Sequence, residues 1–100
     1  VLEKLVTKLQ GWLRKGLVGP RTTANIFWAV AKLEEQVPRL MDLMPDLVDT
    51  VKSVVTDMNS LDTVNVIYAC GLCNLDPAFL QDILPLLAER AWYCSQDWNE

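Results

Sequence analysis

Residues 21–60 and 61–100 of this chain align with one another without a gap. Nine residues recur unchanged at an offset of forty positions: in the first copy they are Thr23, Asn25, Ala29, Leu40, Asp42, Pro45, Leu47, Asp57 and Asn59. Other replacements are conservative, such as Trp28 by Tyr68. A forty-residue period is the size of a helix–turn–helix unit, which buries its apolar face only by stacking on a neighbour. The chain is therefore predicted to be a repeat protein whose function belongs to a surface.

The spacing of apolar residues predicts helices throughout the chain. From Leu2 to Leu13 these residues follow a single helical stripe, typical of an amphipathic helix. We expect an all-α fold, a short, right-handed α-solenoid of about five helices. Residues 1–20 form an N-terminal helix, or half-repeat, and a loop, and residues 21–60 form the first helical repeat. Residues 61–100 form the second repeat, with an aromatic C-terminal segment.

The first helix of each repeat is apolar on nearly every side, which is typical of a helix buried between neighbours. Thr22 or Thr23 is the expected N-cap of the first copy, and Asp62 is the expected N-cap of the second, because short polar side chains satisfy the free N–H groups of a first turn. A loop with two glycines, residues 16–20, precedes the first of these helices.

The second helix of each repeat is expected to start near a proline, Pro38 in one copy and Asp76-Pro77 in the other. Both helices are expected to continue past an internal proline, Pro45 or Pro85. Since proline removes one backbone hydrogen bond, each helix should bend at the same place.

The segment Ala24-Asn25-Ile26-Phe27-Trp28-Ala29-Val30-Ala31-Lys32-Leu33 resembles the first helix of octotricopeptide and related heptatricopeptide repeats, which occur in organellar proteins, including proteins with a RAP domain. Residues 64–72 look like a divergent second copy, with Tyr68 as the aromatic residue. The resemblance implies a chloroplast or mitochondrial location and brings RNA binding into consideration, because many such proteins bind RNA along a basic face. This chain differs in having few repeats and an acidic second unit.

Charge is distributed unevenly along the chain. Residues 1–32 carry six basic side chains against Glu3, a balance of +5, whereas residues 33–100 carry three basic against twelve acidic side chains, a balance of −9. An anionic partner such as RNA is expected at the basic end. The candidate residues for such a site are Lys4, Lys8, Arg14, Lys15, Arg21 and Lys32.

Asn25 and Asn65 stand inside otherwise apolar helices. A buried amide is destabilising by about 1–3 kcal/mol when it is unpaired. We therefore expect each amide to be buried and to have a hydrogen-bond partner, in the next turn or the next unit, with RNA contact as the alternative. Trp28 and Tyr68 occupy equivalent positions, and Trp28 is expected in the core.

The C-terminal segment holds Trp92, Tyr93 and Trp98 on an apolar stripe that has no following repeat to cover it. Exposed aromatic residues usually mark an interface. These three residues are the candidate contacts to a protein partner; the alternative is that they fold back onto the second unit.

Cys70 and Cys73 have the spacing of a redox or zinc site, but Val30 and Leu33 occupy the same positions in the first copy. The cysteines are therefore predicted to be buried, reduced core residues without a metal. A zinc site would need four ligands, whereas the chain offers three cysteines and no histidine. Since there is no phosphate-binding loop and no nucleophile with a base, neither an enzyme nor a cofactor is predicted.

Together these features favour a non-catalytic interaction module, an accessory or scaffold subunit in a larger organellar assembly such as an organellar ribosome or a photosynthetic or respiratory complex. The alternative is an RNA-binding module acting in organellar RNA metabolism, although net acidity disfavours it because affinity for nucleic acid depends on phosphate neutralisation. The longest stretch without a formal charge is thirteen residues, shorter than the roughly 20 residues of a membrane-spanning helix.

Overall fold

The computed structural model describes residues 2–96, and within this range it is helical, with no strand. The five α-helices are α1 (Leu2–Arg14), α2 (Pro20–Leu33), α3 (Met44–Val54), α4 (Ser60–Leu72) and α5 (Pro77–Ser95). Two 3₁₀ segments, η1 (Pro38–Leu43) and η2 (Val55–Asp57), flank α3. The predicted all-α class and the number of helices are confirmed.

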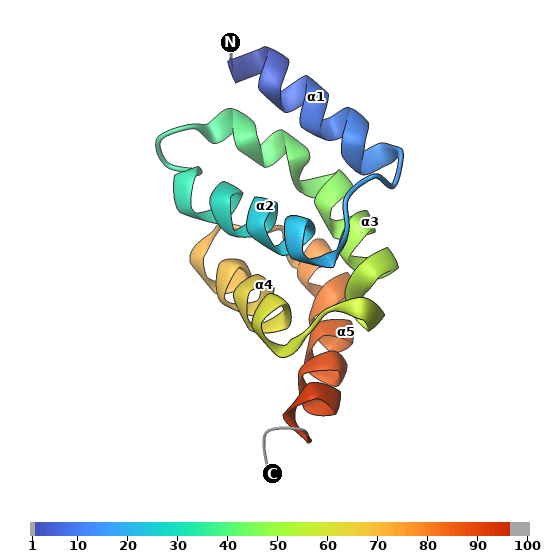
Figure 1. Ribbon diagram of the computed structural model, residues 1–100. Helices are drawn as coiled ribbons and strands as arrows, with labels where there is room; N and C mark the ends of the chain where they lie inside the picture. Colours follow the sequence, from blue (N-terminus) through green and yellow to red (C-terminus); the bar gives the residue numbers. More distant parts are fainter. Residues whose placement is uncertain (1, 97–100) are drawn as a thin grey trace.

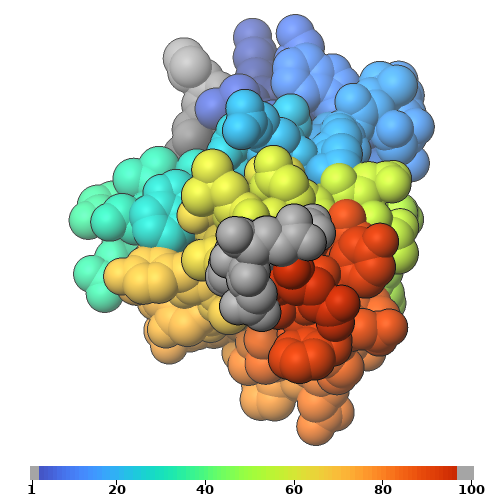
Figure 2. Space-filling view, turned by 60° about the horizontal axis from the view of Figure 1, so that its bottom comes forward, coloured from blue at the N-terminus to red at the C-terminus, as the bar shows by residue number. Residues whose placement is uncertain are grey.

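The helices pack in two layers (Figure 1). Helices α2 and α4 lie side by side and form one layer, while α1, η1 with α3, and α5 follow one another in the second layer. The molecule measures 47 × 26 × 22 Å. In the view of Figure 2, α1 lies at one edge of the molecule and α5 at the opposite edge, so the ends of the second layer are well separated.

Helices α2 and α4 begin forty residues apart and start in the same way. The residue before each helix, Gly19 or Asn59, is extended, and its carbonyl accepts hydrogen bonds from both the N–H and the hydroxyl of the threonine four residues on, Thr23 or Thr63. The predicted N-caps are therefore wrong. Thr23 lies within the first turn rather than before it, and Asp62 donates its N–H to the Asn59 side chain, which is the actual cap.

The two prolines at equivalent positions have different environments. Pro85 lies inside α5, whereas Pro45 is the second residue of α3, where a helix needs no N–H donor. The prediction that both second helices continue past a proline is wrong for the first copy, because the segment before Pro45 is the separate 3₁₀ turn η1, beginning at Pro38. The predicted start of α5 is confirmed: Asp76 caps it and Pro77 is its first residue.

The core lies between the layers. Its largest fully buried side chains include Phe27, Leu43, Leu47, Ile83 and Leu87. Leu43 comes from η1 and the others from α-helices, and each of these elements buries about one side against the core. The expectation that α2 and α4 are buried on nearly every side is wrong, because each leaves a full row of side chains exposed.

Within residues 2–96, no helix is both long and apolar enough to cross a membrane.

Candidate interaction surface

The outward sides of α2 and α4, which face away from the second layer, form one continuous surface, called here the outward face. Its residues recur at helical spacings of four, three and four, which places them on one side of each helix. On α2 they are Arg21, Asn25, Trp28 and Lys32, and on α4 they are Leu61, Asn65, Tyr68 and Leu72. Each α4 residue lies forty positions after its α2 counterpart, and all eight are exposed or half-buried.

Trp28 and Tyr68 form the centre of the outward face. Their ring centroids are 5.2 Å apart with planes inclined at 37°, and the ammonium of Lys32 lies 5.5 Å from the centroid of the Trp28 ring. Trp28 is half-buried and Tyr68 is 57% exposed. Trp28 packs against the edge of the core without being fully buried, so the prediction that it belongs to the core is confirmed only in part.

The amides of Asn25 and Asn65 flank this aromatic pair along the same two helices. Asn25 is exposed and Asn65 is half-buried, and neither side chain makes a hydrogen bond to another described residue. The prediction that both amides are buried and paired is wrong. Their solvent-facing helix positions let water satisfy both groups, so they are free to contact a ligand.

The six basic candidates do not form one patch. Lys4 and Lys8 lie on α1 and Lys15 directly follows it, while Arg21 and Lys32 stand near opposite ends of the outward side of α2. Eleven residues of helix separate the latter two, which corresponds to roughly 16 Å. The basic surface is therefore divided between the two layers.

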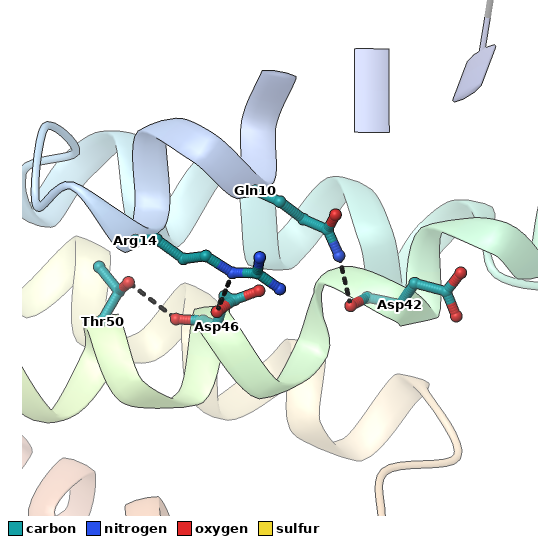
Figure 3. Close-up of polar contacts among 5 residues, drawn as sticks. All are labelled: Gln10, Arg14, Asp42, Asp46 and Thr50. Atoms are coloured by element: carbon teal, nitrogen blue, oxygen red, sulfur yellow. Dashed lines mark hydrogen bonds and ion pairs between the residues drawn. The ribbon is translucent and has the colours of Figure 1, made fainter. Parts of the chain in front are cut away.

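Arg14, the sixth candidate, is engaged in holding α1 against α3. Its guanidinium Nε lies 3.1 Å from the Asp46 carboxylate, which is largely buried (Figure 3). Four residues earlier on α1, the Gln10 side-chain amide donates to the Asp42 carbonyl at 3.2 Å, and on α3 the Thr50 hydroxyl donates to the Asp46 carbonyl at 2.8 Å. Arg14 is therefore a structural residue rather than a free anion contact.

The C-terminal aromatic pair is exposed. Trp92 is 69% and Tyr93 is 65% exposed at the end of α5, so among the described residues they do not fold back to cap the second unit. Arg90 fixes the position of the Tyr93 ring, since its Nε donates to the Met58 carbonyl at 2.7 Å while its guanidinium lies 4.9 Å from the ring centroid. Trp98, the third predicted partner contact, lies outside the described residues.

Cys70 and Cys73 are both buried, with free thiols, as predicted. Burial raises the pKa of Cys70 to about 12, and the nearby Cys73 adds to this effect. Burial also raises the pKa of Cys73, and the Glu34 carboxylate raises it further. Both thiols are therefore protonated at neutral pH, which makes them poor nucleophiles and poor metal ligands.

Among residues 2–96, no group of three or more His, Cys, Asp or Glu side chains is arranged to hold a metal ion. Four acidic side chains form ion pairs with two basic ones: Glu3 and Asp42 with Arg39, and Asp49 and Asp82 with Lys52.

The sequence analysis treated Asn25, Trp28, Asn65 and Tyr68 mainly as structural repeat positions, with RNA contact by the two amides as an alternative. It missed Leu61 and Leu72 as surface residues. The signal was present in the alignment. Positions 21, 25, 28 and 32 share one side of a helix, and so do their counterparts forty residues later.

Comparisons of the chain with protein families, with curated proteins and with solved structures gave no significant match.

Proposed function

We propose that this chain is a non-catalytic helical-repeat interaction module, an accessory or scaffold subunit that docks in a larger organellar assembly such as a ribosome or a photosynthetic or respiratory complex. The organellar setting rests on the resemblance of residues 24–33 and 64–72 to octotricopeptide-type repeats. The partner class rests on the chemistry of the outward face.

Several contacts support the arrangement of the chain as a short α-solenoid of two repeats and a preceding half-repeat. Helices α2 and α4 begin forty residues apart, and their first turns contain the same threonine hydrogen bonds. Trp28 contacts Tyr68, and Glu34 contacts Asn74, so residues forty positions apart meet along both helices. Parallel helices in register are what stacked units produce.

The apolar character of the outward side of α4 is the observation that supports a protein as the partner. Leu61, Tyr68 and Leu72 are all exposed there, at the positions where α2 has Arg21, Trp28 and Lys32. Clustered large apolar side chains on a soluble surface usually mark a contact with another macromolecule. Trp92 and Tyr93 add a second exposed aromatic contact of the kind that dominates protein interfaces.

The test is recovery of the assembly with a tagged chain from organelle extract. With a variant carrying Tyr68→Ala and Leu72→Gln, the amount of co-purifying subunits recovered should fall at least tenfold. A separate variant, with Trp92→Ala and Tyr93→Ala, measures the contribution of the C-terminal pair. The matched control, Leu17→Gln with Leu84→Gln, changes two exposed leucines elsewhere and should recover the assembly unchanged. Full recovery by both aromatic variants would refute docking through these surfaces.

RNA binding is the second candidate, favoured by the two unpaired amides beside the Trp28–Tyr68 pair. Single-stranded RNA is recognised by aromatic stacking, by hydrogen bonds to base edges and by basic side chains along the backbone. Arg21 and Lys32 supply charge on α2, but Leu61 and Leu72 supply none on α4. A protein partner therefore fits the complete surface better.

The two candidates separate by salt dependence. As a scaffold, the isolated chain should bind RNA weakly, and the affinity should fall steeply with added salt, because contacts to phosphate release counterions. Lys4→Glu, Lys8→Glu and Lys15→Glu together should abolish this residual binding without breaking the Arg14–Asp46 pair. Tight binding at physiological salt that Asn25→Ala and Asn65→Ala weaken in a base-dependent way would favour the RNA candidate instead.

A further inference from the structure

The outer side of α1 carries a row of three lysines, called here the lysine row. Lys4 and Lys8 lie on the helix, and Lys15 continues the row because its N–H still donates to the carbonyl four residues earlier, at 3.1 Å. Helical spacings of four and seven residues place all three side chains on one side. The buried residues of α1, Val6 and Leu13, lie on the opposite side, so the lysines point away from the core and are exposed.

The charges of the lysine row are not compensated within the part of the chain that the structure describes. No carboxylate there forms an ion pair with any of the three lysines. Glu3, the acidic residue of α1, pairs with Arg39 at 3.1 Å instead. Asp46 on α3 pairs with Arg14, also at 3.1 Å. The outer side of α1 therefore presents three positive charges, which favour an anionic partner.

Large apolar side chains flank the lysine row. Trp12 is 43% and Leu17 is 68% exposed. The end of the helix turns Leu17 back towards Trp12, because Gly16 has φ 69° and the Leu17 N–H donates to the Trp12 carbonyl at 3.1 Å. Leu5, two turns before Trp12, is 49% exposed and also lines an apolar groove of about 220 Å³ between α1 and α2, beside Ala29. Exposed apolar surface thus adjoins the uncompensated charges.

The lysine row borders an open depression of about 400 Å³ on α1, which is lined by Glu3, Lys4, Thr7 and Lys8. Because the Glu3 carboxylate is engaged in its ion pair, the two ammonium groups and the Thr7 hydroxyl are left to contact a phosphate group. The Lys8 ammonium also lies 5.9 Å from the centroid of the Trp12 ring. A phosphate bound there would lie close to the exposed aromatic side chain.

Helix α1 lies at the edge of the molecule, where a flat surface can reach it. It packs mainly against η1 and α3, on the side opposite the lysine row (Figure 1). In Figure 2, α1 forms one edge of the molecule and α5 the opposite edge. A flat partner can therefore contact the lysine row and its apolar flank along the length of the helix.

RNA, an acidic protein and a membrane with anionic lipids all have the charge that the lysine row requires. RNA is bound through phosphates and through stacking or hydrogen bonds to bases, which gives the exposed Leu5 and Leu17 no role. A membrane surface accommodates both features of α1. Lysine side chains reach lipid phosphates while tryptophan and leucine side chains enter the boundary between headgroups and acyl chains.

We infer that the outer side of α1 binds peripherally to a membrane that contains anionic phospholipids. The lysine row contacts the lipid phosphates, and Trp12 and Leu17 enter the interface. This inference goes beyond the proposed interaction module and uses a surface separate from the outward face. The failure of one can therefore be distinguished from the failure of the other.

The experiment measures sedimentation of the purified chain with vesicles of phosphatidylcholine, either alone or mixed with phosphatidylglycerol. Binding to the mixed vesicles should be at least tenfold tighter and should weaken with added salt. The triple variant Lys4→Gln, Lys8→Gln, Lys15→Gln should bind them on the order of 100-fold more weakly, because each lysine near such a surface contributes roughly a factor of five. The control Lys32→Gln with Lys52→Gln removes charges from α2 and α3 and should bind within about threefold of the parent.

Trp12 reports whether the side chains enter the interface. Vesicles with brominated acyl chains should quench the tryptophan fluorescence of the bound parent chain, and Trp12→Phe should remove most of this quenching, because bromine quenches only at short range. Leu17→Gln with Leu84→Gln, the control of the assembly test, should bind mixed vesicles severalfold more weakly while still recovering the assembly. The outward-face variant Tyr68→Ala, Leu72→Gln should bind these vesicles normally.

Equal binding to the two kinds of vesicle, an unchanged affinity of the triple lysine variant, or quenching that does not depend on Trp12 would overturn the inference. Displacement of the chain from mixed vesicles by single-stranded RNA at equal phosphate concentration and physiological salt would assign the lysine row to nucleic acid instead. Binding to a polyglutamate peptide that is tighter than binding to the vesicles would assign the row to an acidic protein.

Discussion

The carboxylate of Glu34, at the end of α2, accepts the backbone N–H of Asn74 at 3.2 and 3.3 Å from its two oxygens, and the two residues are forty positions apart. The contact joins the residues that directly follow the C-terminal ends of α2 and α4. The same carboxylate raises the pKa of the Cys73 thiol, after the larger effect of burial.

Removal of this contact should weaken the packing between the ends of α2 and α4. Glu34→Ala leaves the Asn74 N–H with water only, and we expect the free energy of unfolding to fall by about 1 kcal/mol, the usual contribution of a partly exposed hydrogen bond. Urea denaturation followed by circular dichroism measures it. The neighbour Glu35, which is exposed, provides the control: Glu35→Ala should change stability by much less, and an equal loss would contradict the assignment.

The N-cap residues of α2 and α4, Gly19 and Asn59, can be exchanged to test whether the two helix starts are equivalent. Gly19 has φ −82° and ψ −178°, nearly the same as Asn59, but it has no side chain to accept an N–H, and a Cβ there meets nothing within 4 Å. Gly19→Asn should therefore stabilise the chain by about 0.5 kcal/mol, and Asn59→Gly should destabilise it by a similar amount. Thermal unfolding of both variants measures the two changes, and a fall in stability for Gly19→Asn would show that the two helix starts are not equivalent.

The Trp28–Tyr68 contact should contribute a measurable coupling energy. In a double-mutant cycle with Trp28→Ala and Tyr68→Ala, we expect about 1 kcal/mol of interaction, the range for aromatic pairs at this separation. The control cycle pairs Trp28→Ala with Trp92→Ala, whose side chain lies at the end of α5. A coupling energy near zero for the first cycle would mean that the two rings lie on the same surface without stabilising one another.

The buried thiol of Cys70 should make stability depend on alkaline pH. Its pKa is raised from 9.0 to about 12 in the folded chain, mainly by burial, so the folded state holds the proton more tightly than the unfolded state. This contribution to stability is complete below pH 9 and is lost progressively between pH 9 and 12.

The test compares the parent chain with the variant Cys70→Val, in which position 70 holds valine, as the equivalent position 30 does. Between pH 8 and 10.5 the parent should lose more stability in urea than the variant does, because the effects of the other groups are common to both. Equal losses would contradict the pKa assignment.

The double variant Cys70→Val, Cys73→Leu should still fold, with a free energy of unfolding within about 1 kcal/mol of the parent. Stoichiometric zinc in the purified parent chain would contradict a packing role for these cysteines.

The periodicity of apolar residues was sufficient to predict the all-α class and the number of helices. The α1 stripe, the Asp76 cap and the burial of Cys70 and Cys73 follow from local spacing and from comparison with the first copy. These features depend on residues a few positions apart or on substitution between equivalent sites, and both are visible in a single chain.

The errors came from features that local pattern cannot resolve. Residues 24–33 are apolar around most of the circumference of the helix. The sequence therefore did not indicate which of them face a neighbouring helix and which face solvent. The structure places Phe27 in the core and Asn25 outside, because α4 and α3 cover only part of α2. Likewise, Pro45 and Pro85 align, yet Pro45 lies in the first turn of a helix and Pro85 lies inside one. The local sequence did not distinguish the 3₁₀ segment before Pro45 from an α-helix.

The sequence alone therefore determined an all-helical chain with a forty-residue period, because helix formation depends on spacing within each segment. Only the tertiary structure decided which sides of those helices remain open: the outward face around Trp28 and Tyr68 and the groove beside Ala29. The physical reason is that exposure is a property of the neighbours of a residue rather than of the residue itself. Positions 29 and 69 both hold alanine, but Ala29 is exposed and Ala69 is fully buried. The reason is that α2 packs along this side of α4, whereas no described helix packs along the same side of α2 to a similar extent.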